Sequence, residues 1–264
     1  MLENKKEFKL ISKKNPRSLL PNTLTIFGVC LGLSSIKFAL DTNFAMAIIA
    51  IGFAAILDTL DGRVARLIKG SSKVGKELDS LTDVISFGVA PGFIMYFWTL
   101  NEIGKFGWMF VLIYTVCCAL RLARFNLMTI EENEAWKINF FEGVPSPAAA
   151  GLVLLPIILS LSGLFQFDHY TILSSIAILT TSILMVSKVP TYSLKRILIP
   201  RKLAIFLLLG IGVYVSLLIF YTFETLFFSG LVYIALIPIS YFHYSRKSKT
   251  TMTDASEDEA EDIL

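Results

Sequence analysis

The chain has 264 residues, of which 55% are hydrophobic and 17% are charged, with a net charge of +3 and a mean hydropathy of +0.67. A soluble domain carries about 25% charged residues, so this composition argues against a soluble fold. Cys30, Cys117 and Cys118 lie in apolar stretches without the spacing of a thiolate metal site or a disulfide framework. No nucleic-acid partner is expected.

The hydrophobic residues are concentrated in blocks of about 20 residues, the length that a helix needs to cross a hydrocarbon core of roughly 30 Å. They predict an all-α fold, a polytopic membrane helical bundle with about eight transmembrane helices. In the third helix, Pro91 followed by Gly92 predicts a kink. The approximate ranges are 22–40, 44–67, 79–99, 106–125, 146–165, 169–187, 203–221 and 224–243.

Two polar segments flank this transmembrane domain, which we place at residues 22–245. Residues 1–21 form a basic segment that is either an interfacial amphipathic helix or a tail that serves only topology. Residues 246–264 form an acidic tail with too little apolar content to pack, and this composition predicts disorder.

The distribution of lysine and arginine predicts the orientation of the chain in the membrane. All of the 24 basic residues except Lys37 and Lys105 fall on one side of the predicted spans: in the two terminal segments, in the connections after the second, fourth and sixth spans, or at adjoining span ends. Basic residues are retained on the cytoplasmic side. We therefore expect both termini in the cytoplasm and the chain in the cell (inner) membrane.

Four aspartates lie where the second span ends and the third begins. Asp58 and Asp61 are three residues apart, and Asp79 and Asp83 are four apart, so each pair shares a helix face. The short connection makes the two helices antiparallel neighbours, so the four carboxylates converge near the cytoplasmic end. Charges within a span are costly and usually functional.

Four carboxylates at close range would repel one another, and divalent cations would remove the repulsion. Carboxylate oxygens suit Mg²⁺ or Mn²⁺, and two such ions suit phosphoryl chemistry. Gly62 and Ala65 leave room beside the aspartates, and Arg66 offers a bidentate contact to phosphate. The alternative from another class is a cation channel or transporter, which would give no purpose to these three residues.

The residues from Asp58 to Asp83 read D-x-x-D-G-x-x-A-R-x8-G-x3-D-x3-D. This pattern resembles the signature of the CDP-alcohol phosphotransferase family. The resemblance implies transfer from a CDP-linked donor to an alcohol, with release of CMP, and it implies a homodimer. Asp58, Asp61, Asp79 and Asp83 would bind two Mg²⁺ or Mn²⁺ ions, with Asp83 also the general base. The implied contacts to the donor are Gly62, Ala65, Arg66, Ser72, Pro21, Asn22 and Thr23.

Three further stretches are similar to the family members that transfer from CDP-diacylglycerol to L-serine: residues 19–22, 121–126 and 143–150. Arg121 and Arg124 would hold the serine carboxylate, and Asn126 would add a hydrogen bond. Plain positive-inside topology is the competing interpretation of both arginines. Within the enzyme class, the alternatives are a phosphatidylglycerophosphate or phosphatidylinositol-phosphate synthase, and an ether-lipid donor is not distinguished from a diacyl one.

Overall fold

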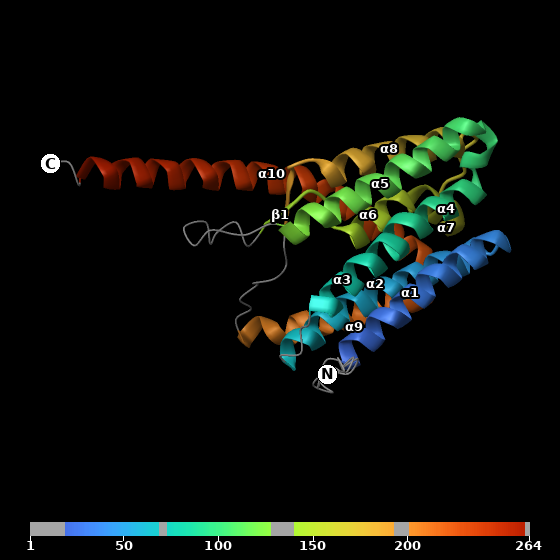
Figure 1. Cartoon of the computed structure of the whole chain (residues 1–264), viewed down its shortest axis with the longest axis horizontal. Coiled ribbons are helices and arrows are strands. Elements are labelled where there is room, and N and C mark those ends of the chain that lie inside the picture. Colours follow the sequence, from blue (N-terminus) through green and yellow to red (C-terminus); the bar gives the residue numbers. More distant parts are fainter. Residues whose placement is uncertain (1–18, 69–72, 128–139, 193–200, 262–264) are drawn as a thin grey trace, which may run out of the picture.

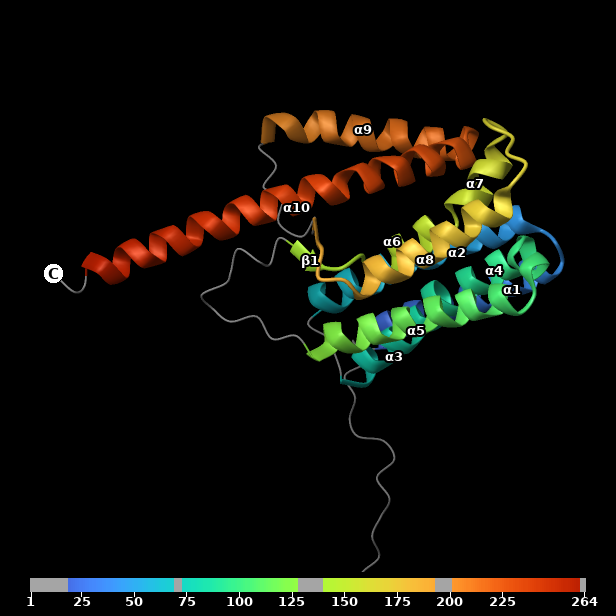
Figure 2. The ribbon, with the colours of Figure 1, turned by 90° about the horizontal axis from the view of Figure 1, so that it is seen from above.

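The computed structural model describes residues 19–68, 73–127, 140–192 and 201–261. Within these ranges the protein is a bundle of helices that alternate in direction, with one two-stranded sheet (Figures 1 and 2). The beginnings of α1, α3, α6 and α9 lie at the same end of the bundle as the ends of α2, α5 and α8. We call this end the carboxylate end because it contains the four aspartates.

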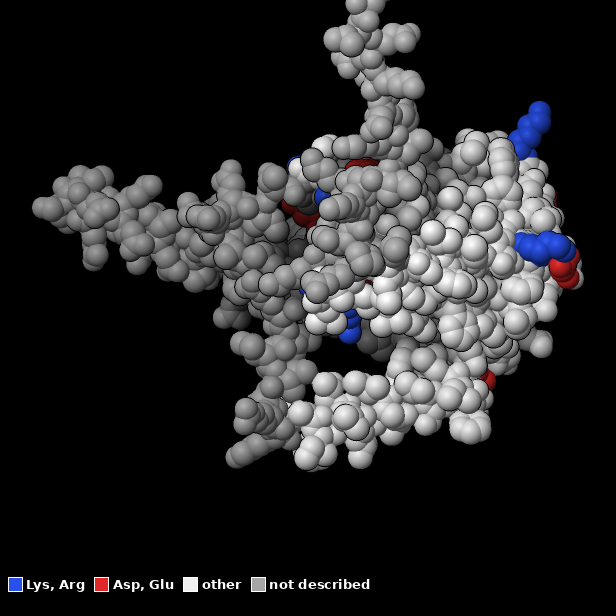
Figure 3. Space-filling view, turned by 60° about the horizontal axis from the view of Figure 1, so that its bottom comes forward, with Lys and Arg blue, Asp and Glu red and all other residues white. Residues whose placement is uncertain are grey.

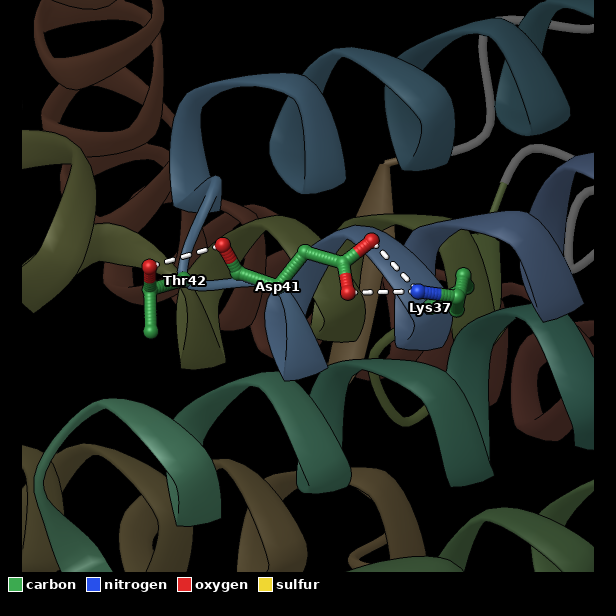
Figure 4. A network of polar contacts seen from close by, with 3 residues as sticks. All are labelled: Lys37, Asp41 and Thr42. Carbon is green, nitrogen blue, oxygen red and sulfur yellow. Dashed lines mark hydrogen bonds and ion pairs between the residues drawn. The ribbon is translucent and has the colours of Figure 1, made fainter.

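Helices α1 (Leu19–Leu40) and α2 (Phe44–Leu67) pack along each other as an antiparallel pair. At the turn, Asn43 accepts a hydrogen bond from the backbone N–H of Met46 at 3.2 Å and caps α2. Lys37 forms an exposed ion pair with Asp41, with Nζ 2.6 Å from Oδ2 (Figure 4). Such a pair stabilises the fold by about 0–1 kcal/mol, and its main effect is to neutralise the charge of Lys37 at this end.

The predicted third span consists of α3 (Lys73–Asp83), the π-helical segment η2 (Val84–Val89) and α4 (Ala90–Trp98). Pro91 has no N–H, so the carbonyl of Phe87 loses its usual helical donor. The buried Tyr114 hydroxyl donates to this carbonyl at 2.7 Å instead. The sequence predicts a kink at Pro91; the structure has a π-helical segment, Val84–Val89, that ends shortly before this proline and begins directly after Asp83.

Helix α1 packs closely against η2, and this packing positions the N-terminal residues of α1 beside the aspartates. A Cβ atom added to Gly32 would lie 2.5 Å from Oγ of Ser86, so only glycine permits this approach. The Ser86 hydroxyl also donates to the carbonyl of Gly28 at 3.3 Å. Pro21 falls in the first turn of α1, where its missing N–H costs no helical hydrogen bond.

The 3₁₀ segment η3 (Leu100–Ile103) leads into α5 (Lys105–Leu127), which packs against η2 and α8 (Tyr170–Val186). Helices α6 (Ser146–Val153) and α7 (Leu155–Ser162) follow one another with a break at Leu154. The antiparallel strands β1 (Phe140–Glu142) and β2 (Pro190–Tyr192), which the sequence did not predict, pair Phe141 with Thr191. This sheet joins the start of α6 to the end of α8 at the carboxylate end.

Helices α9 (Arg201–Phe220) and α10 (Thr222–Glu261) complete the chain. Helix α9 packs against α10, and α10 packs against α7 and β2 (Figure 2). The backbone of residues 246–261 continues α10, whereas the sequence predicts a disordered tail over 246–264. No proline or glycine interrupts this stretch, so the helix has no local signal to end. The predicted basic segment lies outside the described residues up to position 18.

Within the described ranges, six helices are long and apolar enough to cross a membrane, and this confirms a polytopic helical membrane protein. They correspond to six of the eight predicted spans. The other two predicted spans, 146–165 and 169–187, coincide with α6–α7 and with α8, which are shorter helices. The six are Leu20–Leu40, Phe44–Leu67, Val74–Trp98, Lys105–Leu127, Leu203–Phe220 and Thr222–Ser245.

One face of the bundle carries an uncharged band. Figure 3 shows one face on which the coloured charged side chains lie toward the two ends, with uncharged residues between them. On α5, the exposed Leu112, Val116 and Leu120 follow one another at intervals of four and form one apolar helix face. An apolar face of this kind suits contact with lipid tails.

Candidate active site

The carboxylates of Asp58, Asp61 and Asp79 converge between α2 and α3, as their spacing predicts. One oxygen atom from each lies within 4.8 Å of the others. Asp61 is 4% exposed, and the other two are partly buried. The end of α2 and the middle of α3 bring these three acids together because the two helices enter the carboxylate end as neighbours.

Asp83 lies one turn deeper on α3, where its carboxyl group meets that of Asp58. Its Oδ2 accepts a hydrogen bond from the Ser146 hydroxyl at 3.2 Å, and Ser146 accepts one from Nη1 of Arg121 at 3.1 Å. All three side chains are buried. Ser146 therefore connects the guanidinium to the carboxylate by two hydrogen bonds, without a direct ion pair. Ser146 lies in the 143–150 stretch that carries the resemblance, but the sequence assigned no role to Ser146 itself.

Beside the aspartates is a cavity of about 230 Å³ between α1, α2 and α3. It contains most of the residues predicted to contact the donor. A Cβ atom at Gly62 would meet nothing within 4 Å, so this glycine leaves the cavity open beside the helix backbone. The cavity is lined by Pro21, Asn22, Thr25, Asp61, Gly62, Ala65, Arg66, Gly75, Lys76 and Asp79.

Thr25 is a site residue that the sequence did not single out. Its hydroxyl lies 2.8 Å from Oδ2 of Asp61 and 3.0 Å from the carbonyl oxygen of Pro21. The hydroxyl has only one hydrogen, and it donates this hydrogen to Asp61, because the contact is shorter and the acceptor is a carboxylate. This hydrogen bond fixes the Asp61 side chain. The available signal was its position one helical turn after Pro21, on the same face of α1. Lys76, an exposed residue beside the signature residue Gly75, also lines the cavity.

Replacing Thr25 by valine should lower kcat/KM by about tenfold, because Asp61 loses a charge-assisted hydrogen bond. Thr25→Ser, which keeps the hydroxyl, should restore most of the activity. The matched control is Thr59→Val, which removes a hydroxyl from an exposed position on α2 where it bonds only the carbonyl of Ala55 in the described structure. Steady-state kinetics in detergent micelles measure all three, and equal activity of Thr25→Val and wild type would remove Thr25 from the site.

The other residues predicted to contact serine occupy different surroundings. Nη1 and Nη2 of Arg124 donate to the carbonyls of Val186 and Ser187, at 2.8 and 3.2 Å, and so hold the C-terminal end of α8. Nδ2 of Asn126 donates to the Ser80 hydroxyl at 2.8 Å and ties α5 to α3. Of the three predicted contacts, only Arg121 is joined to Asp83 through hydrogen bonds.

Two residues predicted to contact the donor are not placed in the cavity. Thr23 is exposed on α1 and is not among the lining residues. Ser72 lies outside the described residues. Their predicted roles therefore rest on the sequence resemblance alone.

The carboxylates fit a divalent-cation site. Three acidic oxygens lie within reach of one ion, and a hard oxygen donor set suits Mg²⁺ or Mn²⁺. Oδ1 of Asp83 is buried and has no hydrogen-bond partner among the described residues, although a buried carboxylate oxygen normally needs one. A bound cation would supply that partner and offset the repulsion among the four acids.

Comparison with known proteins places this site in context. The family model described as CDP-alcohol phosphatidyltransferase matches residues 18–191, and the model described as CDP-alcohol phosphatidyltransferase 2 matches residues 202–238. Three similar proteins carry the name CDP-diacylglycerol–serine O-phosphatidyltransferase. The one from Mycobacterium leprae is 35% identical over 84% of this chain and 74% of its own length. The one from Helicobacter pylori is 40% identical over 74% of this chain and 81% of its own length. The one from Bacillus subtilis is 36% identical over 64% of this chain and 88% of its own length.

Proposed function

The chain belongs to the CDP-alcohol phosphatidyltransferase family, and we propose that it transfers the phosphatidyl group of CDP-diacylglycerol to the hydroxyl of L-serine, forming phosphatidylserine and CMP. The observation that carries the proposal is the placement of the Asp58, Asp61 and Asp79 carboxylates at the edge of a cavity that also contains Arg66. A cluster of acids would repel a phosphate unless cations intervened, so the juxtaposition suits a metal-dependent phosphotransferase. The names of the relatives support serine as the acceptor.

The donor nucleotide occupies the cavity between α1, α2 and α3 in this proposal. Arg66 and Lys76 supply positive charge for the pyrophosphate, and Gly62 allows a flat group to approach the α2 backbone. Pro21 and Asn22 form the wall on α1. The diacylglycerol chains remain in the membrane beside the apolar helix faces.

Asp83 removes the proton from the serine hydroxyl while the serine oxygen attacks the phosphorus of the diacylglycerol phosphate. The bond from that phosphorus to the bridging oxygen breaks, and CMP leaves with the electron pair. Ser146 holds Oδ2 of Asp83, so Oδ1 remains directed away from that hydrogen bond. Divalent cations bound by the four aspartates would neutralise the charge that develops on the phosphate oxygens.

We place the carboxylate end in the cytoplasm, because all basic residues except Lys37 and Lys105 belong to the segments that adjoin it. The Lys37 charge at the opposite end is offset by Asp41. In this arrangement α6–α7 together and α8 also cross the membrane, which gives eight crossings and two cytoplasmic termini. The resemblance to the family also implies that the protein forms a homodimer.

One competition experiment tests the choice of acceptor. Purified protein receives CDP-diacylglycerol with Mg²⁺ and equal concentrations of serine, glycerol 3-phosphate and inositol 1-phosphate, and mass spectrometry identifies the lipid product. We expect phosphatidylserine, because buried Arg121 offers one guanidinium for one carboxylate, while Arg124 is used by α8. Phosphatidylglycerophosphate or phosphatidylinositol phosphate as the main product would instead support the alternative synthases.

A further inference from the structure

A group of buried polar atoms at and around Arg121 lacks hydrogen-bond partners within the described part of the chain. They are Oδ1 of Asp83, Nε of Arg121 and Oη of Tyr233. A buried polar atom without a partner costs about 1–3 kcal/mol. A cation at the aspartates would satisfy Oδ1 of Asp83, but Nε of Arg121 and Oη of Tyr233 are donors that a cation cannot satisfy, so they indicate that a ligand with acceptor atoms binds there in the functioning protein.

Tyr233 reaches this group from α10, a helix in which the sequence offered no motif. The packing of α10 against β2 brings the Tyr233 hydroxyl next to Thr191 and within electrostatic range of Arg121. Thr191 uses its own hydrogen for the carbonyl of Gly143, at 2.8 Å. The Tyr233 hydroxyl has no hydrogen-bond partner among the described residues, so its hydrogen is available to a ligand near the Arg121 guanidinium.

The donor or acceptor character of these three atoms indicates which groups the ligand carries. Nε of Arg121 and Oη of Tyr233 are donors next to one positive charge, which suits one carboxylate. Oδ1 of Asp83 is an acceptor, which suits a hydroxyl that is about to lose its proton. Ser146, hydrogen-bonded to both Arg121 and Asp83, sets the short separation between the two ends of the ligand.

We infer that Arg121 and Tyr233 together form the carboxylate subsite for the acceptor, and that Tyr233 is a specificity-determining residue for short hydroxy acids such as serine. The inference rests on the proposed function, because it assigns one substrate of that reaction. It also gives a physical reason for rejecting phosphorylated acceptors. A phosphate dianion needs more positive charge than one guanidinium and a neutral phenol supply.

The test is Tyr233→Phe, which removes one oxygen atom and retains the ring. We expect KM for serine to rise about tenfold, as for a lost hydrogen bond to a charged group, while KM for CDP-diacylglycerol stays unchanged. Inhibition by 2-amino-1,3-propanediol, which keeps the hydroxyl and ammonium but lacks the carboxylate, should be the same in both proteins. Removing an unpaired buried hydroxyl should leave the thermal midpoint unchanged or raise it.

Tyr214→Phe is the matched control, because that hydroxyl lies 3.0 Å from Ser229 on the exposed side of α9 and α10. Its kinetic constants should equal those of the wild type. An unchanged KM for serine in Tyr233→Phe overturns the inference, and so does an equal loss of affinity for donor, serine and 2-amino-1,3-propanediol. Failure of the wild-type protein to transfer to serine would instead overturn the proposed function.

Discussion

Asp83→Asn should reduce the rate of phosphatidyl transfer by about 10³-fold or more, because general-base catalysis contributes on that scale and the amide accepts no proton. The fold should survive, because asparagine has the same shape and its carbonyl oxygen still accepts the hydrogen bond from Ser146. Turnover is measured as CMP release from CDP-diacylglycerol and serine. The thermal midpoint of the purified variant checks the fold.

Asp41→Asn is the matched control for this change. It makes the same substitution at an exposed ion pair at the opposite end of the bundle. Its activity should equal that of the wild type. If Asp83→Asn retained substantial turnover, Asp83 would be excluded as the general base, whatever its contribution to cation binding.

Removal of divalent cations should abolish activity, and Mg²⁺ or Mn²⁺ should restore it. The physical reason is that Asp58, Asp61 and Asp79 place negative oxygens within 4.8 Å of one another, beside the cavity that would receive a pyrophosphate. Without cations, these acids repel the donor. Transfer is measured after treatment with EDTA and again after each metal is added in excess.

Thermal unfolding gives a second readout that is independent of turnover. A cation at 100 times its Kd should stabilise the wild-type protein by about 2.7 kcal/mol, and the gain should be smaller in Asp61→Asn. Full activity in EDTA, or equal stabilisation of both proteins by Mg²⁺, would contradict a metal centre at these aspartates.

The aspartate cluster could be predicted from the sequence because it depends only on helical spacing and on a short connection. Asp58 and Asp61 must share a face of α2, and the antiparallel α3 must bring Asp79 nearby. The roles of Arg121 and Arg124 could not be separated in this way. They are three residues apart on one helix, and only the packing of α8 assigns Arg124 to the carbonyls of Val186 and Ser187.

Other parts of the site depend on tertiary contacts that leave no local signal. The π-helical turn after Asp83 is stabilised by Tyr114, which donates to the carbonyl that Pro91 leaves without its usual partner. Ser146 lies in a stretch to which only the resemblance drew attention, and Tyr233 lies in a predicted span to which no site residue was assigned. Their proximity to Arg121 follows from the approach of α6 and α10, which hydrophobic patterning does not specify.

The most direct test of the central claim is the stoichiometry of the reaction in proteoliposomes that contain CDP-diacylglycerol, serine and Mg²⁺. CMP and phosphatidylserine are quantified together by mass spectrometry. The metal-dependent transfer proposed here predicts that they appear in equal amounts, and that neither appears when Mg²⁺ is removed. Cation flux across the liposome membrane without release of CMP would contradict it.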